Sequence, residues 1–223
     1  MVKKIFISTL FFFFFLFGYA QFAYRLKAEI LTKTRLPDST FQISKGQIHY
    51  DQNIKKIIFD FTFPEKEKVV IFDTLMYSFR NAILFQKSKS MLVPEQSFFQ
   101  FILSGNMTNY GFDKSNFKVQ GAEKSKDMIV TTWIPPDGLK KYISKVLVAT
   151  KNKQLYSVTL LDAKEKVINR QILKSYKIIN GMDIPHEVLV ATYLESGSMY
   201  QIITLNNVII NEPGNNKNYD HDL

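Results

Sequence analysis

The feature that most constrains the fold of this sequence is a series of segments in which apolar and polar side chains alternate. Between positions 26 and 36 the even positions are Leu, Ala, Ile, Thr, Thr and Leu, whereas most of the odd positions are charged. A period of two residues, rather than 3.6, is typical of a β-strand with one buried face. A later segment repeats the pattern and would place three aromatic rings on one face of a single strand: Ile57, Phe59, Phe61 and Phe63.

The second predicted strand, over 40–50, changes its phase. Phe41 and Ile43 share one face, whereas Ile48 and Tyr50 share the other, so we expect a β-bulge near Gly46. Bulges of this kind curl a sheet towards a barrel and give it a concave face. Asn180-Gly181 marks the strongest hairpin turn. Further strands are predicted to end at Pro64 and to cover 69–72, 75–79, 128–134, 143–149, 155–161, 167–178, 186–194 and 199–209, as in an antiparallel barrel or sandwich.

The segment 91–106 has a different periodicity. Pro94 is a suitable helix start, and Ser104-Gly105-Asn106 is a suitable stop. Between them, four apolar residues recur at helical spacing: Phe98, Phe99, Ile102 and Leu103. We expect a short apolar helix over the mouth of the cavity, either as a plug that belongs to the core or as a lid that moves for a ligand.

The first 20 residues have the organisation of an export signal. Lys3 and Lys4 precede an apolar run that includes five consecutive phenylalanines, and small residues at Gly18 and Ala20 predict cleavage after Ala20. The apolar stretch of about 16 residues is shorter than the roughly 20 that span a bilayer, which leaves an uncleaved anchor as the alternative. We expect a signal peptide over 1–20, a single domain over 21–211 and a polar, flexible tail over 212–223.

Composition and spacing exclude several classes of function. The chain has no cysteine, so it forms no disulfide and has no lipidated N-terminal cysteine. Its net charge of +9 favours anionic partners, but no basic cluster is interleaved with exposed aromatics as in a nucleic-acid groove. The three histidines have no second ligand at metal-binding spacing, and no nucleophile elbow or phosphate loop occurs. We therefore expect no metal, no cofactor, no nucleic-acid partner and no catalytic residue.

The order of these segments resembles that of the LolA-like outer-membrane lipoprotein carriers, over about 26–211. The resemblance rests on five stretches: Ser44-Lys45-Gly46-Gln47-Ile48-His49-Tyr50, the strand that ends at Pro64, Val69-Val70-Ile71-Phe72-Asp73 with Met76-Tyr77-Ser78-Phe79, the short apolar helix, and Leu155-Tyr156-Ser157-Val158-Thr159-Leu160. The chain departs from the family in two places. The first strand follows the cleavage point too closely for the family's N-terminal helix, and Asp51-Gln52-Asn53-Ile54-Lys55-Lys56 replaces the Arg-Pro pair that latches the lid.

The resemblance implies a mainly β fold, an antiparallel, half-open β-barrel with a short lid or plug helix. It also implies a periplasmic, monomeric carrier that holds the acyl chains of lipoproteins and exchanges them with sorting components of the inner and outer membranes. We expect the cavity to be lined by Ile57, Phe59, Phe61, Phe63 and Trp133, and covered by Phe98, Phe99, Ile102 and Leu103. Burial of a chain of about 16 carbons would contribute roughly 12 kcal/mol before entropic costs. The alternatives are a lipid sensor or accessory protein on the same fold, a lipid-ester hydrolase and a structural surface protein.

Overall fold

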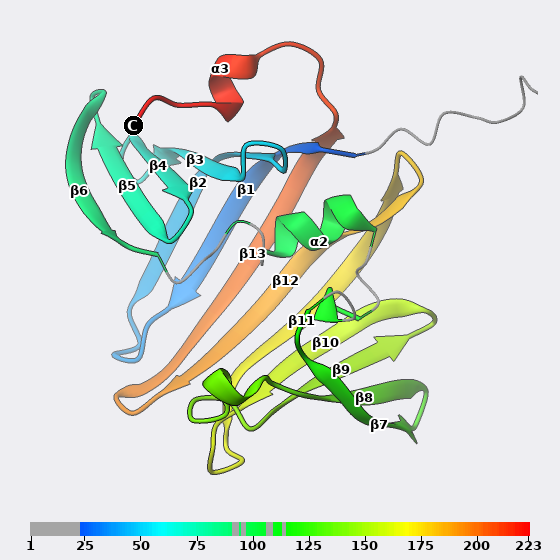
Figure 1. The fold of residues 1–223 in the computed structure, drawn as a ribbon. Helices are drawn as coiled ribbons and strands as arrows, with labels where there is room; N and C mark the ends of the chain where they lie inside the picture. The colour runs from blue at the N-terminus through cyan, green and yellow to red at the C-terminus, as the bar shows by residue number, and fades with distance from the viewer. Residues whose placement is uncertain (1–22, 91–93, 95–96, 106–108, 113–114) are drawn as a thin grey trace, which may run out of the picture.

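A computed structural model describes residues 23–90, 94, 97–105, 109–112 and 115–223 (Figure 1). Its main feature is one antiparallel sheet of 13 strands. The strands are β1 Arg25–Arg35, β2 Phe41–Asp51, β3 Lys56–Phe63, β4 Glu67–Phe72, β5 Leu75–Arg80, β6 Ile83–Lys89, β7 Lys118–Ser125, β8 Met128–Ile134, β9 Lys145–Lys151, β10 Gln154–Leu161, β11 Val167–Ile179, β12 Met182–Leu194 and β13 Gly197–Ile210. The short helices are α2 Phe98–Ser104, α3 Asn216–Tyr219 and the 3-10 helix η4 Asp137–Leu139.

The strand order places the first and the last strand next to each other in the middle of the sheet. Strands β1 to β6 follow one another outwards on one side, β13 to β7 follow one another on the other side, and β1 pairs with β13. The edge strands β6 and β7 do not pair, so the curved sheet stays open. The prediction of a mainly β, incomplete antiparallel barrel is therefore confirmed.

A bulge lies at the predicted position, but the extra residue comes from β3. Strand β2 stays in register with β1 along its whole length, whereas its register with β3 shifts between Lys45 and Gly46, where Thr62 is the additional residue. The phase change that the sequence shows in β2 has another cause: Phe41 and Ile43 are apolar residues exposed on the convex face. At Gly46 the backbones approach so closely that a Cβ atom would lie 2.3 Å from the carbonyl oxygen of Asp60.

The main hydrophobic core lies on the concave face, beneath α2. The even-numbered residues of β1 and β2 point to this side, and Leu26, Ala28, Ile48 and Tyr50 are fully buried there. Figure 1 shows α2 in front of β12 and β13, on the concave side of the sheet. Within the described part of the chain, no helix is long and apolar enough to cross a membrane.

Helix α2 ends where the sequence predicts and begins later. The side chain of Ser97 accepts a hydrogen bond from the Gln100 N–H and caps the first turn. Gly105 ends the helix in the left-handed conformation, with a φ of 65°. Pro94 lies before the cap, where its carbonyl oxygen accepts hydrogen bonds from Ser97.

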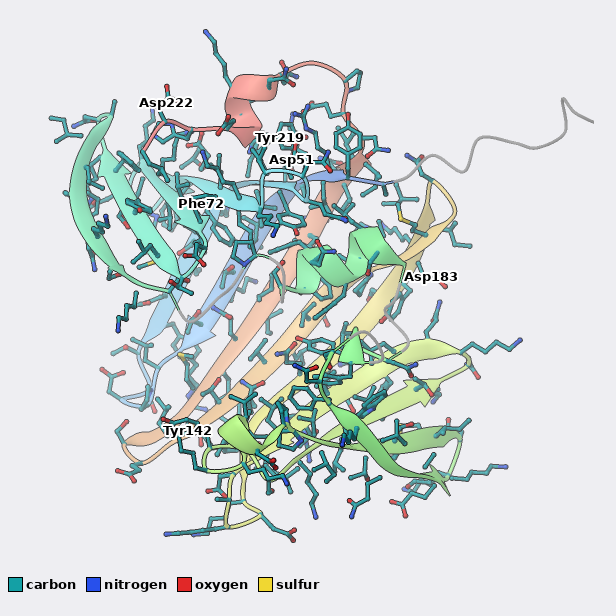
Figure 2. The ribbon with its side chains drawn as sticks, viewed as in Figure 1. Asp51, Phe72, Tyr142, Asp183, Tyr219 and Asp222 are labelled. Carbon is teal, nitrogen blue, oxygen red and sulfur yellow. The ribbon has the colours of Figure 1, made fainter. Side chains whose placement is uncertain are left out.

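The C-terminal segment packs against the convex side of the sheet, which differs from the expected flexible tail. Tyr219 of α3 is fully buried, with its ring 5.2 Å from that of His49 and 4.6 Å from the guanidinium carbon of Arg25. Arg25 also pairs with the buried Asp51 at 2.5 Å, and Figure 2 shows Asp51 and Tyr219 close together below α3. An aromatic anchor within a polar stretch therefore fixes this segment.

Candidate functional site

A cavity of about 460 Å³ lies between the concave face of the sheet and α2. This volume is within the range of roughly 300–1,000 Å³ that is usual for sites of small ligands. Its apolar lining residues come from β1, β3, β12, β13 and α2: Ile30, Phe59, Phe61, Phe98, Phe99, Val188, Val190, Ile203 and Leu205. Its polar lining residues are Thr32, Thr34, Gln42, Ser44, Tyr110, Gln171 and Gln201.

Four phenylalanines form one wall of the cavity. The rings of Phe59 and Phe61 are stacked, with centroids 5.7 Å apart and planes only 4° from parallel. Phe99 approaches Phe59 edge-on at 6.5 Å, and Phe98 approaches Phe99 edge-on at 5.7 Å. Offset and edge-to-face pairs are favourable arrangements of aromatic rings, so the cover and the sheet meet in an ordered aromatic contact.

Another part of the lining is polar and, in the described residues, uncharged. Thr34 pairs across the sheet with Gln42 on one side and Gln201 on the other, and the Gln201 amide donates a hydrogen bond to its hydroxyl at 3.2 Å. The Tyr110 hydroxyl donates to Gln171 Oε1 at 3.0 Å, and burial raises the pKa of Tyr110 to about 12. Among the described residues that line the cavity, none carries a charge at neutral pH.

A polar side chain of α2, that of Gln100, is hydrogen-bonded to the sheet. Gln100 is the one polar residue between Phe98 and Leu103, and its Oε1 accepts a hydrogen bond from the hydroxyl of Tyr50 at the end of β2. Sequence reasoning missed both residues, although a lone glutamine in an apolar helix was a usable signal. Because buried polar groups are nearly always hydrogen-bonded, such a residue indicates a partner on the element below.

The structure places four of the predicted site residues in the cavity lining and the other five elsewhere. Phe59, Phe61, Phe98 and Phe99 line the cavity. Ile57 of β3 and Ile102 and Leu103 of α2 are at most 5% exposed and belong to the packed core between the sheet and the helix. Ile57 shares the concave face with Phe59 and Phe61 but lies at the start of β3, and Ile102 and Leu103 lie in the last turn of α2, so these residues pack in the core beside the cavity.

Phe63 and Trp133 lie away from the cavity for different reasons. The register shift at Thr62 pairs Phe63 with Lys45, on the convex face, where it is 48% exposed. Trp133 is on the concave face, but the ring of Phe112 covers it at 5.6 Å. The sequence analysis missed the polar part of the lining and also its aliphatic part, because these residues come from strands that only the sheet topology brings together. The aliphatic lining residues are Ile30, Val188, Val190, Ile203 and Leu205.

Nothing in the described residues resembles a metal centre. In that part of the chain, no group of three or more His, Cys, Asp and Glu side chains is placed to hold a metal ion. His49 and His186 are buried in strands, and burial lowers the pKa of both below the usual 6.5.

Comparisons with known sequences give no match, neither to a model of a protein family nor to a curated protein. Comparison with solved structures does give matches. A LolA superfamily protein from Nitrosomonas europaea is similar over 90% of this chain and 92% of its own length, with a TM-score of 0.60 and 13% identity. The chain has a LolA-like fold.

Two further structures agree with this assignment. A domain from Vibrio parahaemolyticus assigned to outer membrane lipoprotein sorting aligns with a TM-score of 0.60 and 13% identity, over 87% of this chain and 88% of its own. A DUF1329 family protein from Desulfovibrio piger aligns with a TM-score of 0.65 and 11% identity, over 90% and 91%. The likeness that the sequence predicts to LolA-like proteins is therefore confirmed for the fold.

Proposed function

We propose that this protein is a periplasmic carrier that holds the acyl chains of lipoproteins or other lipids in the cavity beneath α2, for transfer towards the outer membrane. The observation that carries the proposal is the cavity of about 460 Å³, which has an aromatic wall and whose described lining residues are all uncharged. Each methylene buried there would contribute about 0.8 kcal/mol. The likeness to a lipoprotein-sorting domain supports this choice of ligand.

The lining also favours one chemical form of the acyl group. An ionised carboxylate inside the cavity would find no cationic partner among the described lining residues, and burying an unpaired charge is costly. Ester and amide groups are neutral, and they can accept hydrogen bonds from the side-chain amides of Gln42 and Gln201. We therefore expect acyl chains linked as esters or amides, as in lipoproteins and phospholipids, to bind more tightly than free fatty acids.

Release requires that the cover be weakly held. Helix α2 is one short element, attached by apolar contacts and by the bond between Gln100 and Tyr50. A cover whose closed and open forms differ by only a few kcal/mol would let a carrier both retain and deliver its ligand. The sites of pickup and delivery would be sorting components of the two membranes, and the protein would reach the periplasm through a signal peptide cleaved after Ala20. That predicted signal lies outside the described residues.

The first experiment is mass spectrometry of lipids that remain bound to the purified protein. Wild-type protein should carry acyl lipids, and Phe61→Glu should lose them because it places a charge in the aromatic wall. Ile178→Glu is the matched control, since Ile178 is 76% exposed and should tolerate the same change. Circular dichroism should be unchanged in both variants. Wild-type protein without bound lipid, or equal lipid retention by Phe61→Glu, would refute the proposal.

A second experiment separates a carrier from a lipid sensor or accessory protein on the same fold. Depletion of a carrier should leave lipoproteins in the inner membrane, as seen by membrane fractionation. Normal sorting after depletion, together with retained lipid binding, would assign the protein to the second class. Turnover of a panel of lipid esters would instead indicate a hydrolase.

A further inference from the structure

The convex face carries an exposed patch, outside the cavity, in which apolar and basic side chains alternate. Its apolar members are between 40% and 75% exposed: Phe41, Ile43, Phe63, Tyr200 and Ile202. Its basic members are Lys33, Arg35 and Lys45, from the same strands. We call this set the basic–apolar patch.

The strand register brings these residues into adjacent rows. Arg35 lies between Phe41 of β2 and Tyr200 of β13, and in the next row Lys33 lies between Ile43 and Ile202. In the third row, Lys45 lies next to Phe63 of β3. Directly paired residues of neighbouring strands are close enough for their side chains to form one continuous surface. Each cation of the patch is therefore flanked by an exposed apolar side chain.

The basic residues of this patch differ from those of the other half of the convex face. There, lysines and arginines are neutralised by acidic partners at 2.5–3.0 Å, in the pairs Arg25–Asp51, Lys27–Glu212, Lys56–Asp220 and Lys68–Asp60. The C-terminal segment also covers that half, through Tyr219 and His221. Among the ion pairs between described residues, none includes Lys33, Arg35 or Lys45. The part of the convex face beneath the C-terminal segment is therefore neutralised and covered, whereas the basic–apolar patch is exposed.

Few acidic groups oppose this charge. Glu187 lies across β13 from the third row, where Lys174 of β11 pairs with it across the sheet. Asp38 of the β1–β2 turn accepts two hydrogen bonds from Thr40. Arg170 adds a further positive charge at the end of the first row, since it pairs with Ala191 next to Tyr200. Within the three rows across β2, β1, β13, β12 and β11, the basic side chains of Lys33, Arg35, Lys45, Arg170 and Lys174 therefore outnumber the one acidic side chain, that of Glu187.

We infer that the basic–apolar patch docks the protein onto the surface of a membrane that contains anionic lipids. Cationic side chains gain energy near anionic headgroups, while exposed Phe, Tyr and Ile side chains enter the boundary between headgroups and acyl chains. Because the two kinds of residue alternate on the patch, it can contact the anionic headgroups and the boundary with the acyl chains at the same time. A second copy of the same face would instead bring like charges together, which opposes a symmetric dimer.

The position of the patch relative to the cavity gives the docking a use. Thr34, Gln42 and Gln201 line the polar part of the cavity, and they are the sequence neighbours of Arg35, Phe41 and Tyr200 on the opposite face of the same strands. One end of β1, β2 and β13 therefore carries both features. Docking through the patch would hold the polar part of the cavity within one sheet thickness of the lipid surface.

Vesicle flotation with purified protein tests this inference. Wild-type protein should float with phosphatidylcholine vesicles that contain phosphatidylglycerol, and added salt should weaken the binding because it screens the charges. Binding to vesicles of phosphatidylcholine alone should be much weaker. Neutralising two basic residues with Lys33→Gln and Arg35→Gln should lower the partition coefficient about 25-fold, since each basic residue near such a surface contributes about fivefold. Phe41→Ser with Ile43→Ser should also weaken binding.

Matched controls keep the test specific. Lys89→Gln with Lys124→Gln removes two exposed lysines from the edge strands and should bind vesicles as the wild type does. Phe61→Glu should also float normally, so a failure of acyl binding is distinguishable from a failure of docking. The inference is overturned if the control pair and the patch pair lose binding equally, or if the patch pair keeps wild-type binding. Sedimentation would also overturn the inference if it showed a dimer that dissociates when the patch residues are substituted.

Discussion

Protonation of His49 should destabilise the fold when the pH falls below neutrality. His49 is only 4% exposed in β2, below the ring of Tyr219, and neither ring nitrogen has a hydrogen-bond partner among the described residues. Burial lowers the pKa of His49 from 6.5 to about 4, and the positive charge of Lys27 acts in the same direction. Other charged groups nearby have smaller effects: Glu212 and Asp60 raise this pKa, and Lys68 lowers it.

The size of the effect follows from the two pKa values. The unfolded chain protonates His49 near pH 6.5, whereas the folded protein does so only near pH 4, so the unfolded state binds more protons between them. The free energy of unfolding therefore decreases as the pH falls through this window. The full loss is about 3 kcal/mol, of which about 2 kcal/mol occurs between pH 7 and pH 5. For a chain of this length, this loss lowers the Tm by roughly 4–8 °C.

Thermal unfolding followed by circular dichroism at pH 7 and pH 5 measures this loss. His49→Leu should make the difference in Tm between the two pH values smaller by roughly 4–8 °C, because the titrating group is gone. Ile58→Val, at the position paired with His49, should lower the Tm equally at both pH values. His186 and His221 remain in all three proteins, so their contributions cancel. An unchanged pH dependence in His49→Leu would refute the reasoning.

Three further substitutions test contacts that the structure shows. Gly46→Ala should destabilise the protein by about 1–3 kcal/mol in urea unfolding, since a Cβ has no room against β3, whereas Gly121→Ala, in open space, should have no effect; equal stabilities would disprove the close approach. Gln100→Ala removes the hydrogen bond to β2 and should speed lipid release about fivefold, which fluorescence of a bound lipid probe would show; an unchanged rate would mean that this bond does not hold the cover. Asp51→Asn breaks a buried ion pair and should cost about 3–5 kcal/mol in thermal unfolding, whereas Lys140→Gln in an exposed pair should cost less than about 1 kcal/mol; similar losses would contradict the assigned burial.

Most strands could be predicted because they have one buried face. The alternation in β1 and β3 predicted their extended conformation, and the Asn180-Gly181 turn lies in the hairpin between β11 and β12, with φ angles of 50° and 77°. The edge strands β6 and β7 were missed because their side chains are almost all exposed, which leaves no period of two to detect. The turn before β6 also gave no signal, because alanine rarely adopts a positive φ such as the 62° of Ala82.

The aromatic part of the cavity could be predicted, and the polar part could not. The rings of Phe59 and Phe61 share a face within one strand, so the sequence alone relates them. Gln42, Gln201 and Thr34 are related only by the pairing of β2, β1 and β13, a property of the whole sheet. Phe63 shows the opposite case, because one extra residue at Thr62 moved it to the other face.

The pairing of β1 with β13 has a consequence for how the protein is made. All other neighbouring strands of the sheet are also neighbours in the sequence, whereas this pair joins Leu26 to Ile210. The pairs Ile30–Leu205, Thr32–Ile203 and Thr34–Gln201 lie along this junction and line the cavity. Each half of the chain can form hairpins while synthesis continues, but neither half contains the whole cavity lining. The cavity beneath α2 can therefore form only once the last strand has been synthesised and has joined the first.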